Sequence, residues 1–337
     1  MKRITFETPH DSYLDACQEA GFAHVVARDA SFTDPATGET VDVPFSMFTV
    51  NDANPQEVYG HGLVRGSFTI QNMPDLAIWA QPIMDQTGAV AMSAAIRRGV
   101  VGSAAEGARV SLSLRLPDVP GPVDGDVFEV RADVATGFDG SLSSVLIADV
   151  RYKGFFVAIP KPDGKAGGYK QEPVKHTKHS NKKVKGLAGL AAAHLNRYVD
   201  VLVNECSSLQ AVSMDDASAE TIILKALQVK RTEGETLPTR SQNNLDKILG
   251  YFRNGSRTAL GLYLALCRYA TEDISVRIPV PASIQQSGAL AIEAYRDEQE
   301  ATYREESNWF EGTGEKFRIR AWKAVQARAI DLRRLAS

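Results

Sequence analysis

The residues best suited to bind a ligand lie in one basic stretch, residues 151–186. This stretch holds ten lysines and arginines but only two acids, Asp163 and Glu172, so its net charge is +8 in a chain of formal net charge −3. Lysines spaced along a segment can neutralise successive phosphates of a nucleic acid and release its counterions. We therefore expect phosphate contacts from Arg151, Lys153, Lys161, Lys165, Lys170, Lys175, His176, Lys178, Lys182, Lys183 and Lys185.

Aromatic residues accompany the bases of this stretch. Tyr152, Phe155 and Tyr169 are candidates to stack on bases, because aromatic rings beside a basic groove are the usual means of binding single strands without sequence preference. The alternative is that the lysines are merely solvated and that Phe155 and Phe156 belong to the core of a strand.

Metal binding and catalysis receive little support from the sequence. His176 and His179 are three residues apart, but lysines surround them and no third ligand lies nearby. The run Gly164–Gly168 lacks the order of glycine, lysine and serine or threonine that a phosphate-binding loop requires. We expect no catalytic residue, no metal and no cofactor, so the chain is not expected to be an enzyme.

The cysteines and the N-terminal residues indicate where the protein works. Cys17, Cys206 and Cys267 are odd in number and far apart, which argues against a disulfide framework or a zinc site. The first residues lack the apolar core of a secretory signal, and the longest apolar stretch, residues 259–270, is too short to span a bilayer. We expect a cytoplasmic protein of a bacterial host cell.

Hydrophobic periodicity predicts an α+β fold in which an N-terminal antiparallel sheet with packed helices precedes a mainly helical region. The expected boundaries are 1–160 for the sheet domain, 161–185 for a basic loop and 186–337 for the helices. In residues 108–116, Val110, Leu112 and Leu114 alternate with polar residues, as in a half-buried strand. Pro44 within residues 41–50 favours an edge strand or a bulge.

The C-terminal region repeats apolar residues at helical spacing, and its charge is segregated. Residues 293–311 have a net charge of −5 and contain several aromatics, whereas residues 315–337 have a net charge of +5. Opposite charge on two segments allows them to pair, within one molecule or between copies.

Several stretches resemble the phage/plasmid-like protein family, a domain of unknown function carried by phages, plasmids and mobile islands. The likeness rests on residues 136–141 followed by 148–151, on Val174–Thr177, and on the late helix at residues 256–270. Phe138 stands where that family usually has a turn histidine, and the usual Cys-x-Asn after the arginine is missing. The resemblance implies replication, recombination or host-takeover work, without an agreed activity.

These observations together predict binding of single-stranded DNA, with annealing or protection by an oligomer as the specific hypothesis. The likeness of the expected architecture to phage single-strand annealing proteins is an analogy of fold, which does not determine function. The alternative is a protein-interaction factor that modulates a host enzyme or defence system, with residues 293–311 as its working surface. The expected partners are therefore nucleic acid, a second copy of the chain or a host protein, and no membrane.

Overall fold

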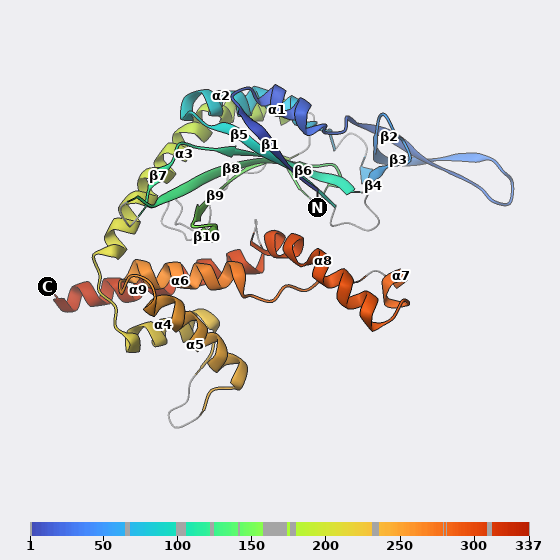
Figure 1. The fold of residues 1–337 in the computed structure, drawn as a ribbon. Coiled ribbons are helices and arrows are strands. Elements are labelled where there is room, and N and C mark those ends of the chain that lie inside the picture. Colours follow the sequence, from blue (N-terminus) through green and yellow to red (C-terminus); the bar gives the residue numbers. More distant parts are fainter. Residues whose placement is uncertain are drawn as a thin grey trace. The chain divides into compact units, whose positions relative to one another are not determined.

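The structure is a computed structural model, shown as a ribbon in Figure 1. It describes residues 2–64, 68–98, 106–121, 125–140, 142–157, 174–175, 180–230, 236–278, 280, 282–308 and 312–336. The described chain is α+β, with an N-terminal antiparallel sheet region followed by a mainly helical region, so the predicted fold class is confirmed.

The chain forms two compact units. The first contains Met1–Pro117, Val130–Ala148 and Lys170–Asn196, and the second contains Asp118–Glu129, Asp149–Tyr169 and Arg197–Ser337. Strands β8 and β9 and helix α3 each begin in one unit and end in the other.

The larger sheet is antiparallel and has the strand order β1-β5-β6-β8-β9-β10, with β7 paired to β8. Its strands are β1 (Lys2–His10), β5 (Val90–Arg98), β6 (Glu106–Arg115), β7 (Val119–Pro120), β8 (Val127–Gly137), β9 (Val145–Tyr152) and β10 (Phe155–Val157). A smaller sheet has the order β2-β3-β4, formed by Val25–Thr33, Thr40–Asn51 and Val58–Val64.

Apolar and polar residues alternate along β6, and the apolar side chains lie in the core of the first unit. Val110, Leu112 and Leu114 are at most 4% exposed, and they share the core with Trp79 and Ile83 of the helix α2 (Ala77–Thr87). Figure 1 shows α1 (Tyr13–Ala20) and α2 along one face of β1, β5 and β6. The alternating pattern in residues 108–116 therefore predicted the strand correctly, but the strand is not half-buried, because Ser111 and Ser113 on its other face are only 2% and 8% exposed.

Local signals set the ends of the helices in the first unit. Ser12 caps α1 by accepting a hydrogen bond from the backbone of Asp15, and Gly21 ends it in the left-handed conformation at φ 61°. A 3₁₀ turn, η1 (Met73–Leu76), leads directly into α2.

The second unit is built mainly from helices. They are α3 (Ser180–Gln210, from residue 197 onward), α4 (Asp216–Leu227), α5 (Thr239–Arg253), α6 (Ala259–Glu272), α7 (Ala282–Gln285), α8 (Ala289–Asn308) and α9 (Thr313–Ala336). Asp215 and Thr258 cap α4 and α6 through their side chains. The core includes Tyr263 and Trp322, which meet edge to face with ring centroids 4.9 Å apart.

Within the described part of the chain, no helix combines the length and the apolar character that a bilayer crossing requires.

Candidate nucleic-acid interface

The structure describes only part of the basic stretch. Side chains are described for Arg151, Tyr152, Lys153, Phe155 and Lys175. Lys182, Lys183 and Lys185 lie on the described backbone of α3. Outside the described residues lie Lys161, Lys165, Tyr169, Lys170, His176 and Lys178.

The stretch begins in the hairpin formed by β9 and β10. Tyr152 pairs with Phe155, and the two residues between them, Lys153 and Gly154, both have positive φ (49° and 86°). Positive φ at both central positions is the requirement of a type I′ turn, which matches the twist of the flanking strands. The Lys153 side chain is 58% exposed at the tip of this hairpin.

The two described stacking candidates are buried. Tyr152 is 6% exposed and Phe155 is 8% exposed, and their rings meet edge to face at 5.6 Å between centroids. Tyr152 also packs against Phe128 at 5.2 Å. Because neither ring presents an open face in this structure, stacking on a base would require the hairpin to rearrange.

The carboxylate of Asp126 contacts two neighbouring residues of the hairpin. Its carboxylate accepts a hydrogen bond from the Tyr152 hydroxyl and lies 3.0 Å from the Nζ of Lys153. The hydrogen bond from Tyr152, followed by that from Lys153, lowers the pKa of Asp126 below its usual value. Burial and the same carboxylate raise the pKa of Tyr152. Lys153 is therefore paired in the structure, and a phosphate would compete with Asp126 for it.

Phe156 anchors the same hairpin in the second unit. Its backbone N–H donates to the Oγ1 of Thr271 at 3.1 Å, and its ring lies 4.3 Å from the guanidinium of Arg151 and 5.3 Å from that of Arg318. Arg318 is only 3% exposed and donates to the backbone oxygen of Asn308 at 2.7 Å. Cations over an aromatic face are attracted by its quadrupole, so Arg151 has a structural contact that does not involve phosphate.

The described residues after this gap are held by the first unit. Val174 exchanges two backbone hydrogen bonds with Ser144, at 3.1 and 2.8 Å, and is 3% exposed. Ser144 belongs to a buried network in which its hydroxyl donates to the Oε1 of Gln71 at 2.6 Å. The exposed Lys175 follows directly. The lysine-rich stretch thus has defined attachment points on both sides, Val157 and Val174.

The start of α3 places positive charge where a helix repels it. The helix begins at Ser180, and Lys182, Lys183 and Lys185 follow within its first two turns, with no acid in the first turn. The N-terminal end of a helix carries a partial positive charge, so each lysine there costs about 0.3–1 kcal/mol unless an anion is near. A phosphate at this end would satisfy both the lysines and the helix.

The structure also shows a positive feature that the sequence analysis missed. On the face of the first sheet opposite α1 and α2, the cross-strand register places Arg97 opposite Arg109 and Arg115 opposite Arg131. Like charges directly opposite each other destabilise a sheet, so both positions favour a nearby anion, whether a carboxylate of the protein or a ligand. Arg97 is 6% exposed and donates to the Oγ of Ser111 at 2.7 Å, which gives that position a structural role. The polar half of the alternation in residues 108–116 was the available signal.

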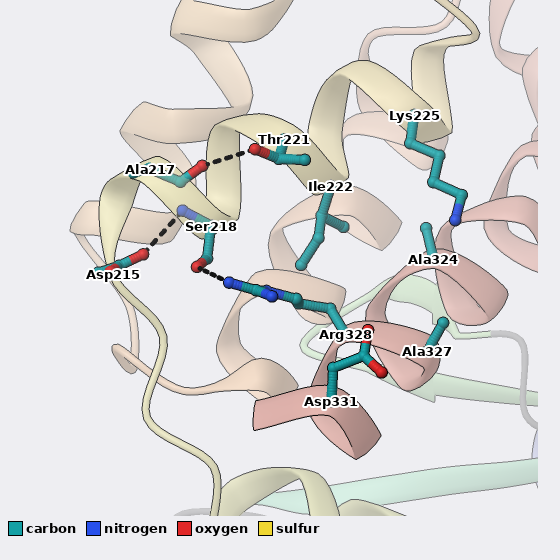
Figure 2. A pocket seen from close by; sticks show the side chains of 10 residues that line it. All are labelled: Asp215, Ala217, Ser218, Thr221, Ile222, Lys225, Ala324, Ala327, Arg328 and Asp331. Carbon is teal, nitrogen blue, oxygen red and sulfur yellow. Dashed lines mark hydrogen bonds between the residues drawn. The ribbon is translucent and has the colours of Figure 1, made fainter. Parts of the chain in front are cut away.

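The remaining polar clusters are structural in character. Figure 2 shows a surface pocket of about 530 Å³ between α4 and α9, where Arg328 donates to the Oγ of Ser218 at 3.2 Å and Asp215 accepts from the backbone of Ser218. The backbone hydrogen bond from Ser218 is the main cause that lowers the pKa of Asp215, as expected of a helix cap. The two hydroxyls that line this pocket are engaged, that of Ser218 by Arg328 and that of Thr221 by the backbone oxygen of Ala217.

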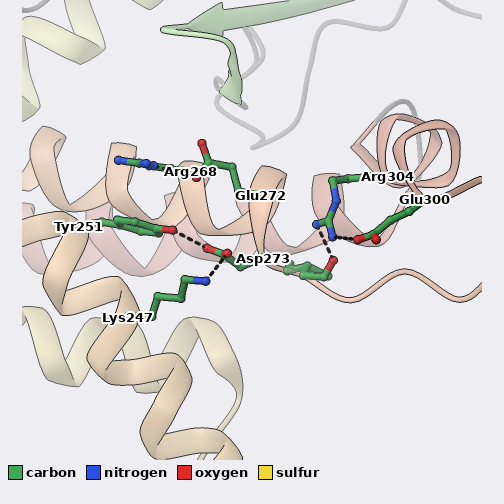
Figure 3. A network of polar contacts seen from close by, with 8 residues as sticks. Lys247, Tyr251, Arg268, Glu272, Asp273, Glu300 and Arg304 are labelled. Carbon is green, nitrogen blue, oxygen red and sulfur yellow. Dashed lines mark hydrogen bonds and ion pairs between the residues drawn. The ribbon is translucent and has the colours of Figure 1, made fainter. Parts of the chain in front are cut away.

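A second network joins α5, α6 and the chain that follows α6. In Figure 3, Asp273 accepts a hydrogen bond from the Tyr251 hydroxyl at 2.9 Å and pairs with the Nζ of Lys247 at 2.6 Å. Burial, followed by this hydrogen bond, raises the pKa of Tyr251 to about 12. Arg268 stacks over the Tyr251 ring at 4.3 Å and pairs with Glu272. These contacts hold α5 and α6 together through paired charges.

The described residues contain no reactive cysteine and no cluster of metal ligands. All three cysteines are free and buried, and burial raises the pKa of Cys17 and of Cys206 to about 12, which disfavours the reactive thiolate. No cluster of three histidine, cysteine, aspartate or glutamate side chains in the described part of the chain could hold a metal ion.

No model of a protein family matches the chain, and no curated protein or solved structure matches it either. The resemblance to the phage/plasmid-like protein family therefore stays a prediction.

Proposed function

We propose that the protein binds single-stranded nucleic acid, with DNA as the favoured form, through the basic stretch at residues 151–186. The observation that carries the proposal is the lysine-rich start of α3, where Lys182, Lys183 and Lys185 follow Ser180 with no compensating acid in the first turn. Evolution toward stability alone favours acids at that end of a helix. A phosphate ligand gives a physical reason for the opposite choice.

Two further features support the same proposal. The stretch has a net charge of +8 while the rest of the chain is acidic, so its field is concentrated in one place. Most of its lysines lie close together in sequence, so a single strand can contact several of them at successive phosphates. A rigid duplex would require a preformed surface of matching shape.

The proposed contacts differ in kind along the stretch. Lysines supply point charges to phosphates, a sequence-independent contribution. Tyr152 and Phe155 are buried, so base stacking by either ring requires rearrangement, and Tyr169 is the remaining stacking candidate. We propose work in the cytoplasm of a bacterial host, in replication or recombination of a phage or plasmid.

The direct test is fluorescence anisotropy of labelled single- and double-stranded oligonucleotides titrated with the protein over a salt series. We expect tighter binding to single strands and a steep loss of affinity as salt rises. Absence of binding to either form at low salt would refute the proposal.

A second candidate function, interaction with a host protein, is favoured by the surface of α8. Leu290 is 83% exposed there, and Glu293, Asp297 and Glu298 are exposed beside it. A surface pocket of about 830 Å³ lies next to this helix, lined by residues that include Ile292 and Arg296. Reversal of lysine charges in the basic stretch abolishes the first function and leaves this one intact.

A further inference from the structure

The smaller sheet extends into an arm of two strands. Strand β3 pairs with β4 from Ser46 to Val50, whereas its N-terminal half pairs only with β2 in the described residues. Figure 1 shows the β2–β3 hairpin extending beyond β4, away from the first unit's larger sheet. We call residues 29–46 the arm.

The arm has a regular tip. Asp34 and Glu39 close it through the backbone, with the Asp34 N–H donating to the Glu39 oxygen at 2.9 Å, and Gly38 has the positive φ that the turn requires. The Asp34 carboxylate accepts from the backbone N–H of Ala36 at 2.8 Å. These are local turn contacts, so the hairpin is a built feature of the sequence.

One face of the arm is apolar and open to solvent. Phe32 and Val41 lie directly opposite each other, are 54% and 43% exposed, and therefore share that face. Val43, two residues along β3, is 38% exposed, and Phe45 is 80% exposed. A hairpin of two strands is marginally stable by itself, and a run of exposed large apolar residues marks an interaction surface.

A bulge lies within the arm, at its base. The register shifts between Asp29 and Ser31, so that several residues of β3 face one residue of β2. Pro44 lies in this bulge, as the sequence predicts, and Phe45 next to it has φ 59°, a left-handed conformation that is costly for an aromatic residue. The bulge turns Phe45 outward, where it is 80% exposed.

The charge of the arm selects the chemistry of its partner. Residues 29–46 contain four acids, Asp29, Asp34, Glu39 and Asp42, and no lysine or arginine. Such a surface repels nucleic acid and suits a partner that is basic and partly apolar.

Helix α9 presents a surface of that kind. Lys316, Lys323, Ala327, Ile330 and Arg334 are exposed and recur at helical spacing along one side, and Ile330 is 44% exposed. This side spans 18 residue steps, roughly 27 Å of helix, which is similar to the roughly 20–30 Å of a hairpin of this length.

We propose that the arm of one molecule docks on the exposed side of α9 in a second copy of the chain. Acidic groups of the arm face Lys316 and Lys323, and Phe32 and Val41 cover Ile330. A reciprocal exchange of arms gives a two-fold dimer, whereas a one-way contact repeated head to tail gives a ring or a filament. This proposal does not depend on nucleic-acid binding.

A swap of charges between the arm and α9 tests whether they pair. The molar mass of the protein in solution is measured by light scattering over a range of protein and salt concentrations. We expect wild type to self-associate, and we expect Glu39→Lys and Lys323→Glu each to weaken association about tenfold or more, because Glu39 lies on the same side of the arm as Val41. The combination of the two substitutions restores it. A wild type that stays monomeric, or a combination that fails to restore association while circular dichroism shows native folding, overturns the proposal.

An apolar substitution supplies a matched control. Phe32→Ser weakens association, whereas Leu290→Ser, which removes another highly exposed apolar side chain on α8, leaves it unchanged. Equal effects of the two would refute the docking of the arm. Nucleic-acid affinity per subunit is measured in parallel with the Glu39→Lys variant, so that failure of either proposal is seen separately.

Discussion

The Nζ of Lys153 lies 3.0 Å from a carboxylate oxygen of Asp126, and that carboxylate also accepts the hydroxyl hydrogen of Tyr152. One acid thus holds an exposed cation and a buried phenol at the point where the basic stretch begins. The contact gives the stretch a fixed start, and it has a consequence for pH.

Asp126→Asn is expected to remove a pH-dependent contribution to stability. The hydrogen bonds from Tyr152 and Lys153 lower the pKa of Asp126 in the folded state, so the contribution is present above the unfolded value of about 3.9 and is lost as pH falls through the lower folded value. Thermal unfolding of both proteins from neutral pH to below about pH 4 measures this. The difference in Tm between the two proteins shrinks on acidification, and a difference that stays constant with pH would contradict this account.

Two glycines on neighbouring helices are expected to respond oppositely to alanine. A Cβ at Gly261 would lie 1.8 Å from the backbone oxygen of Ser256, so Gly261→Ala destabilises the second unit by about 3 kcal/mol or more. A Cβ at Gly250, within α5, meets no described atom within 4 Å, so Gly250→Ala stabilises by up to about 1 kcal/mol. Urea denaturation measures both, and a neutral Gly261→Ala would contradict the close approach.

Substitutions of Phe155 can show whether its ring serves the protein core or stacks on a nucleic-acid base. The ring is 8% exposed, so Phe155→Ala is expected to cost about 3–5 kcal/mol in the free energy of unfolding. Phe155→Leu preserves most of the buried volume and is expected to keep nucleic-acid affinity. A stacked ring contributes about 1–3 kcal/mol per base, so a roughly fivefold or greater loss of affinity in folded Phe155→Leu would instead support stacking.

Local patterns predicted the elements of this fold well. The alternation from Val110 to Leu114 predicted a strand, and Pro44 predicted an edge strand or a bulge. Each of these depends on residues close together in the chain, where sterics and periodicity act directly.

Local sequence patterns did not predict which residues far apart in the chain would pair. The bridge between Ser144 and Val174, and the packing of Phe156 against Thr271 of α6, join residues that no local period connects. The buried state of Tyr152 and Phe155 follows from the same tertiary contacts. The length of the β2–β3 arm was also missed, because its exposed apolar residues resemble those of an ordinary buried strand in sequence.

The proposed phosphate-binding site depends most on the lysines at the start of α3. Lys182→Glu/Lys183→Glu places acids at the positive end of the helix, so it is expected to stabilise α3 by about 0.3–1 kcal/mol per residue while it weakens phosphate binding. The matched control, Lys225→Glu/Lys230→Glu, makes the same change of charge at exposed positions outside the stretch.

The most direct test of this site is the fluorescence anisotropy of a labelled single-stranded oligonucleotide over a salt series. The oligonucleotide is titrated with wild type, with Lys182→Glu/Lys183→Glu and with the matched control. We predict that Lys182→Glu/Lys183→Glu binds at least roughly tenfold more weakly and that its dependence of log K on log salt is shallower by about two phosphate contacts. The control keeps most of the wild-type affinity and its slope. Equal loss in both variants, or none in either, would contradict a phosphate site at the start of α3.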